Sequence, residues 1–142
     1  MVGSYAGSPQ ERGQVFNALN PVIGAAAVDQ RLNARIDMAR FRFMLVVVST
    51  AAIGGTITVT AETYAAPTGG TSTDAGSVSF TNSEDDTAKR IAVRVESGLR
   101  YLDIHVVTTG TGNDYHVAIH GMGAIDVRDV DYLANAPQIQ MS

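Results

Sequence analysis

Residues 89–122, KRIAVRVESGLRYLDIHVVTTGTGNDYHVAIHGM, decide the fold class because apolar and polar side chains alternate along three parts of the segment. The apolar positions are Ile91, Val93 and Val95, then Leu102, Ile104 and Val106, and then Tyr115, Val117 and Ile119. A period of two residues is typical of β-strands with one buried and one exposed face. The segment therefore predicts three strands, with the apolar residues facing a core.

Turn-forming residues separate these three predicted strands. The first pair is joined by residues 97–100, where Gly98 suits a tight two-residue turn because glycine accepts a positive φ. The second pair is joined by residues 109–113, TGTGN, which is a run of turn-forming residues. If each turn closes a hairpin, Val95 lies opposite Leu102 and Ile104 lies opposite Ile119. The turns thus predict a three-stranded antiparallel meander, with Arg94 opposite Asp103.

Further strands are expected upstream. Residues 56–63 alternate strictly, with Ile57, Val59 and Ala61 on the apolar face, and residues 39–48 become apolar on both faces. Residues 28–38 are expected to be extended, and residues 77–81 to form a short edge strand. These elements predict an all-β fold: an antiparallel β-sandwich or jelly-roll-like domain with extended N- and C-terminal arms.

The chain is expected to contain one domain and two arms, because 142 residues suffice for one core only. We assign residues 1–27 to an N-terminal arm rich in Gly and Pro, residues 28–125 to the β-sandwich, and residues 126–142 to a C-terminal tail. Apolar side chains in the arms are candidate contacts with another protein. These candidate interface residues are Tyr5, Val15, Phe16, Leu19, Tyr132 and Leu133.

The composition narrows the classes of partner. Charged residues make up 17% of the chain, below the roughly 25% usual for soluble domains, so we expect a partner to cover part of the surface. The net charge is −4, and no basic cluster is denser than Arg35, Arg40 and Arg42, which argues against nucleic acid. The longest apolar run, residues 43–48, is too short to cross a bilayer, and residues 1–20 lack the pattern of a secretory signal.

The sequence predicts neither an enzyme nor a cofactor or metal site. Cysteine is absent, and there is no Gly-x-Ser-x-Gly motif. His105, His116, His120 and Asp103 are expected on one outer face, but His116 and His120 would lie about 13 Å apart along a strand, too far to share an ion. The acidic run Glu84, Asp85 and Asp86 lacks the spacing of a calcium loop, so we interpret it as a solvated turn.

Three segments of the chain together resemble the head decoration (cement) proteins of tailed bacteriophages. They are residues 34–43, ARIDMARFRF; the Gly54-Gly55 loop before residues 56–59, TITV; and the closing hairpin from residues 101–108, YLDIHVVT, to residues 116–121, HVAIHG. The resemblance covers about residues 28–125. It implies a virion protein, made in the host cytoplasm, that binds the major capsid protein on the capsid surface through terminal arms, as a homo-oligomer with a trimer favoured.

Two other classes of function remain open from the sequence. One is a neck or tail component of the virion built on a similar sandwich, which the size of an oligomeric ring would distinguish. The other is a receptor- or carbohydrate-binding β-module, for which exposed aromatic residues on a sheet face would be expected. The chain has no Trp, and of the two Tyr residues in the predicted meander, Tyr115 is expected to face inward.

Overall fold

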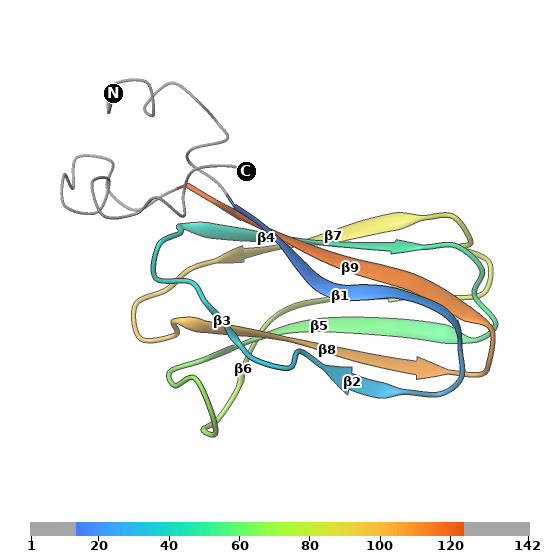
Figure 1. The fold of residues 1–142 in the computed structure, drawn as a ribbon, viewed down its shortest axis with the longest axis horizontal. Helices are drawn as coiled ribbons and strands as arrows, with labels where there is room; N and C mark the ends of the chain where they lie inside the picture. The colour runs from blue at the N-terminus through green and yellow to red at the C-terminus, as the bar shows by residue number, and fades with distance from the viewer. Residues whose placement is uncertain (1–13, 124–142) are drawn as a thin grey trace.

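The computed structural model describes residues 14–123, which form nine β-strands in two packed antiparallel sheets, with no helix in this range (Figure 1). The strands are β1 (Gln14–Ala25), β2 (Asp29–Arg31), β3 (Ile36–Asp37), β4 (Phe43–Thr50), β5 (Thr56–Tyr64), β6 (Thr73–Phe80), β7 (Ala88–Arg94), β8 (Tyr101–Thr109) and β9 (Asn113–Met122). The expected all-β sandwich is confirmed.

The order of the strands identifies a jelly roll. One sheet has the order β1-β9-β4-β7, and the other has β2-β8-β5-β6, with the short β3 also pairing with β8. Each early strand pairs with a late one: β1 with β9, β2 and β3 with β8, β4 with β7, and β5 with β6. A long hairpin folded over on itself produces this nested pairing, which is the double-sheet jelly-roll arrangement. The choice between a jelly roll and an open sandwich is thereby settled.

The predicted meander is wrong, although its three strands exist. β7 pairs with β4, β8 pairs with β2, β3 and β5, and β9 pairs with β1 and β4. Arg94 therefore lies opposite Phe43, and Asp103 lies opposite Glu62. Both connecting turns carry the chain from one sheet to the other. Alternation of apolar residues specifies which face of a strand is buried, but it does not specify the strand beside it.

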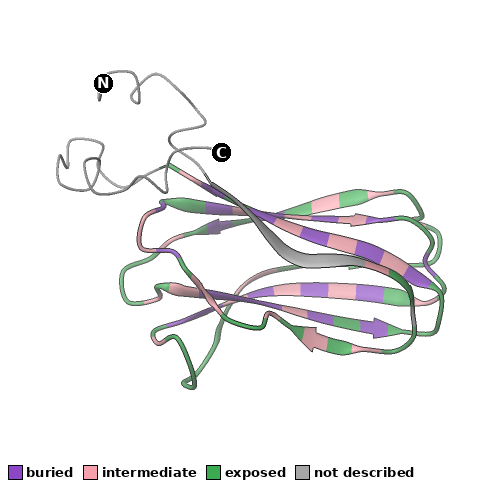
Figure 2. Cartoon of the chain, in the orientation of Figure 1, coloured by how far each residue is buried: buried purple, intermediate pink, exposed green. Residues whose placement is uncertain are grey.

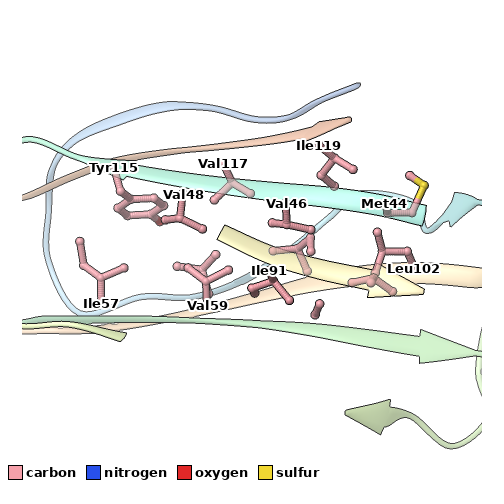
Figure 3. Packing of buried hydrophobic residues seen from close by; sticks show 14 of the residues in the cluster. Met44, Val46, Val48, Ile57, Val59, Ile91, Leu102, Tyr115, Val117 and Ile119 are labelled. Carbon is pink, nitrogen blue, oxygen red and sulfur yellow. The ribbon is translucent and has the colours of Figure 1, made fainter. Parts of the chain in front are cut away.

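The apolar positions predicted from the alternation form the core between the two sheets (Figures 2 and 3). Side chains with no exposed surface come from both layers: Met44, Val46, Val48, Val117 and Ile119 from one, and Ile57, Val59, Phe80, Leu102, Ile104 and Val106 from the other. Tyr115 faces inward as expected, and its hydroxyl donates to the Oε1 atom of Gln30 at 2.9 Å. Burial of this apolar surface is the main stabilising contribution.

Part of the predicted N-terminal arm belongs to the sandwich. Residues 14–25 form β1 at the edge of a sheet, so Val15, Phe16 and Leu19 occupy strand positions opposite His120, Ile119 and Val117 of β9. Pairing with β9 satisfies backbone groups that an arm would leave to solvent. The other candidate interface residues, Tyr5, Tyr132 and Leu133, lie outside the described residues, as does the C-terminal tail, residues 126–142.

The turn between β4 and β5 packs directly on the turn between β8 and β9. The buried side chain of Asn113 joins them: its Oδ1 atom accepts from the backbone N–H groups of Gly54 at 3.1 Å and Gly55 at 3.2 Å, and its Nδ2 atom donates to the Thr109 carbonyl at 3.0 Å. A Cβ atom on Gly54 would lie 1.6 Å from the Thr111 carbonyl oxygen. Only glycine permits this approach of two backbones.

Candidate interaction surface

Two loops meet at one end of the sandwich, which we call the basic end. They are residues 38–42, between β3 and β4, and residues 95–100, between β7 and β8. Backbone hydrogen bonds connect them: Met38 N–H donates to the Arg100 carbonyl, and Val95 N–H donates to the Arg42 carbonyl, both at 2.8 Å. The first of these loops contributes two buried side chains, Met38 and Phe41, to the hydrophobic core. The core thus fixes the position of this surface.

A cleft runs between these loops. It has two adjoining parts, of about 580 and about 540 Å³, which share Ala39, Phe41 and Arg100. Five arginines line the cleft: Arg35, Arg40, Arg42, Arg94 and Arg100. Asp37 and Glu96 are its acidic residues, so five positive and two negative charges give +3 in a chain whose net charge is −4. We call this surface the basic cleft.

Arg100 and Arg35 are held by internal partners. Arg100 makes a two-point contact with Asp37, from Nε to Oδ1 at 2.8 Å and from Nη2 to Oδ2 at 2.7 Å. The hydrogen bond from Arg100 lowers the pKa of the Asp37 carboxyl, and the backbone N–H of Ala39 assists. The Arg35 guanidinium stacks on the Tyr64 ring, 3.3 Å from its centroid, and donates to the carbonyls of Ala66 and Gly69. These two arginines stabilise loops.

Arg42 and Arg94 line the part of the cleft next to β4 and β7. Within residues 14–123, the guanidinium groups of Arg42 and Arg94 have neither a hydrogen bond nor an ion pair. Phe43 follows Arg42 in the chain, is opposite Arg94 in the sheet and remains 45% exposed. Arginine and aromatic side chains are enriched among the residues that contribute most to protein–protein binding. Arg42, Phe43 and Arg94 therefore form a surface suited to a protein that presents carboxylates.

Only part of this surface could be predicted from the sequence. Arg35, Arg40 and Arg42 lie close together in the chain, and three arginines are too few to predict a nucleic-acid-binding site. Arg94 and Arg100 join them because β7 pairs with β4 and because Arg100 binds Met38 and Asp37. No local signal near residue 94 points to residue 42. The pairing of β4 with β7 would have been needed to find the cleft.

A second group of charged side chains lies on the outer face of the other sheet. Nη1 of Arg31 contacts Oε1 of Glu62 at 2.6 Å and Oδ2 of Asp103 at 3.3 Å. His105 Nε2 is 2.6 Å from Oδ1 of Asp29. Burial opposes ionisation of Glu62, but hydrogen bonds from Arg31 and Tyr64 outweigh it and lower its pKa. The hydrogen bond to Glu62 raises the pKa of Arg31. This group joins β2, β5 and β8.

Replacing Arg31 with Met should destabilise the protein by about 2 kcal/mol at pH 7, because Glu62 and the buried Asp103 lose a charged donor. A carboxyl whose pKa is lowered by folding stabilises the protein above its unfolded pKa, 4.5 for Glu62, and this contribution disappears as the pH falls through the folded pKa. The difference between variant and wild type should therefore shrink below about pH 4. Urea unfolding of both proteins at several pH values measures this difference in unfolding free energy.

Arg90→Met is the matched control for this experiment. Arg90 is an exposed arginine of β7 that makes no hydrogen bond or ion pair with residues 14–123. Its replacement should change the unfolding free energy by less than about 0.5 kcal/mol at any pH. A difference for Arg31→Met that stays the same from neutral to acidic pH would contradict the role given to Glu62.

The three histidines do not share a face. His105 lies in β8 and His116 and His120 lie in β9, so the two strands place them in different sheets. Asp103 lies in β8, so the expectation that it shares a face with His116 and His120 is wrong for the same reason. No group of three or more His, Asp or Glu side chains among residues 14–123 has the arrangement of a metal site. In the same range, the structure contains no helix long and apolar enough to cross a membrane.

Comparisons with known proteins give similarity in fold only. No family model matches the sequence, and no curated protein matches it. A structure of Bacillus endospore appendages, described as disulfide-linked pili, aligns with a TM-score of 0.45 and 13% identity over 78% of this chain and 88% of that chain. A chain of infectious bursal disease virus, Gx strain, aligns with a TM-score of 0.46 and 13% identity over 81% of this chain but only 33% of its own length.

PirA, known from a crystal structure, is also similar, with a TM-score of 0.41 and 13% identity over 79% of this chain and 85% of that chain. Sequence identities this low are compatible with many unrelated functions on one fold. We therefore take no function from these similarities. The jelly-roll assignment rests on the strand pairings themselves.

Proposed function

We propose that this protein is a virion structural protein that binds the outside of an assembled phage capsid and stabilises it as a decoration protein. The observation that carries the proposal is the position of the two ends of the described chain. Gln14 lies opposite Gly121, and Met122 lies opposite Phe43, so both ends are at the basic end of the sandwich (Figure 1). Two terminal segments, of 13 and 19 residues, therefore begin beside one charged cleft.

A protein of this shape would act by adding contact area. The jelly roll supplies a rigid body, and the terminal segments supply apolar residues such as Tyr5, Tyr132 and Leu133 for contact with the major capsid protein. Each contact can be weak, because many copies on one particle and several contacts per copy raise the overall affinity. The resemblance to decoration proteins supports this reading, and the low fraction of charged residues agrees with a surface that is partly covered in the assembled particle.

Co-sedimentation with capsids that lack the protein tests the proposal. The full chain should bind saturably, at a fixed ratio to the capsid protein. Deleting residues 1–13 should reduce the bound fraction at least about tenfold and leave the unfolding transition unchanged, because β1 begins at Gln14. Deletion of the whole predicted arm, residues 1–27, would also remove β1 and confound the result.

Unchanged binding by the shortened chain would contradict a role for the N-terminal segment. No binding by the full chain would contradict the decoration role. In that case a ring-sized oligomer, detected by light scattering, would favour a neck or tail component.

A further inference from the structure

The end of the sandwich opposite the basic cleft is acidic. β4 runs from Phe43 at the basic end to Thr50 at the other, and β7 returns from Ala88 to Arg94. The β6–β7 loop and the start of β9 meet there: Asp86 N–H donates to the Ala51 carbonyl at 3.0 Å, and Asp114 N–H donates to the Ala52 carbonyl at 2.7 Å. Figure 1 shows the two ends at opposite extremes of the long axis.

Four carboxylates and one ammonium group give this acidic end its charge. The residues are Glu84, Asp85, Asp86, Asp114 and Lys89, so the sum is four negative charges and one positive, or −3. Lys89 pairs with Glu84 at 2.6 Å. Asp85 and Asp114 accept backbone N–H groups, from Ile53 at 3.0 Å and Gly24 at 2.6 Å, which orient these carboxylates without neutralising them. Within residues 14–123, no cationic side chain pairs with Asp85, Asp86 or Asp114.

Each end also presents one large apolar side chain. Ile23 is 84% exposed and precedes Gly24, whose N–H binds Asp114, so Ile23 lies at the acidic end. Phe43, 45% exposed, lies in the basic cleft. In the described part of the chain, the only other exposed large apolar side chain is Val107. An apolar contact surrounded by charged groups is the usual composition of a protein interface.

We propose that the acidic end of one copy docks into the basic cleft of a second copy, so that subunits associate head to tail. The charges of the two ends, +3 and −3, are complementary, and Arg42 and Arg94 are available to carboxylates that have no cationic partner in their own subunit. Guanidinium and carboxylate groups form short, charge-assisted hydrogen bonds. Such a contact joins two different surfaces, so it builds a ring if the rotation closes and a filament if it does not.

This inference rests on the proposed role as a virion structural protein and names a second copy as the occupant of the basic cleft. A nucleic acid would meet a chain of net charge −4, whereas a second copy offers an acidic surface held in position by backbone hydrogen bonds. The proposed capsid contact uses the terminal segments, whereas the head-to-tail contact uses residues of the sandwich. The two contacts can therefore be tested separately.

The experiment is sedimentation velocity of the full chain over a range of concentrations. At about 50 mM salt the protein should form species heavier than the 14.9 kDa monomer, and at about 500 mM salt it should dissociate, because salt screens the charges.

Two double variants should each weaken association about tenfold or more. One combines Arg42→Gln with Arg94→Gln, and the other combines Asp86→Asn with Asp114→Asn. Asn retains the acceptor that binds Gly24 and tolerates the positive φ of Asp86. Arg90→Gln, which removes an exposed arginine outside the cleft, is the control and should not change association.

Mixing the two double variants gives the decisive result. The arginine variant keeps its acidic end and the aspartate variant keeps its basic cleft, so the mixture should form dimers through one intact contact but nothing larger. Any one of three results would overturn the inference. The full chain could stay monomeric at low salt, neither double variant could affect association, or the mixture could contain no dimers. If the full chain is monomeric and the arginine variant loses capsid binding, the cleft binds the capsid instead, and the decoration role stands without the head-to-tail contact.

Discussion

Replacing Gly54 with Ala should destabilise the protein by about 3 kcal/mol or more. The new Cβ atom would lie 1.6 Å from the Thr111 carbonyl oxygen and 2.8 Å from its carbon, both of them backbone atoms that no side-chain rotation can move. To make room, the two turns must separate. Separation breaks the hydrogen bonds through which the buried Asn113 holds Gly54 and Gly55. Two backbone N–H groups would then lose their partner, which adds to the steric cost.

Equilibrium unfolding in urea measures the effect, and Gly69→Ala provides the control. Gly69 has a φ of 65°, but a Cβ atom there would meet nothing within 4 Å, so only the cost of the left-handed backbone, about 1 kcal/mol, should appear. Equal losses for the two variants would contradict the close approach of the β4–β5 and β8–β9 turns. The comparison separates steric exclusion from backbone strain.

Replacing Phe41 with Ala should cost about 3–5 kcal/mol, the range observed when a buried aromatic ring is truncated. The Phe41 ring is 5% exposed and packs so closely on Gly121 that a Cβ atom there would lie 2.8 Å from Cδ1 of the ring. It supports the loop between β3 and β4, which carries Arg40 and Arg42. Loss of the ring should therefore lower the stability of the protein and disorganise the basic cleft.

Phe43→Ala is the matched control, because the same side chain is removed two residues along the chain from a position that is 45% exposed. Its unfolding free energy should change by less than about 1 kcal/mol. The head-to-tail inference predicts that this variant nevertheless weakens association. Thermal unfolding of both variants measures the contribution of each ring to stability, and sedimentation velocity measures its contribution to association. A larger loss of stability for Phe43→Ala than for Phe41→Ala would contradict this assignment.

The buried faces of the strands could be predicted from the sequence because side-chain direction alternates along a strand whatever lies beside it. Ile104 and Val117 are buried as predicted, and so are Ile57 and Val59. The partners could not be predicted, because turn residues such as Gly98 suit a hairpin as well as a passage between two sheets. In a jelly roll the pairs are distant in the chain: residue 14 lies opposite residue 121. Local patterns do not contain that information.

The long separation in sequence between paired strands also explains which part of the candidate surface could be predicted from the sequence. Residues 35–42 carry three of the five arginines of the basic cleft, and the other two, Arg94 and Arg100, arrive through strand pairing. The sequence alone predicts that the acidic run at residues 84–86 is a solvated turn. Its place at the end of the molecule opposite the arginines follows only from the course of β4 and β7. The two complementary ends are thus a property of the fold.

The proposed function is binding to the outer surface of a capsid. Electron cryomicroscopy of capsids assembled with and without the protein is the most direct test of this proposal. We predict added density on the outer surface at fixed lattice positions, into which the jelly roll of residues 14–123 fits with its basic end and both chain ends close to neighbouring subunits. Capsids with identical density in both samples, or added density confined to the neck or tail, would contradict the proposed decoration role.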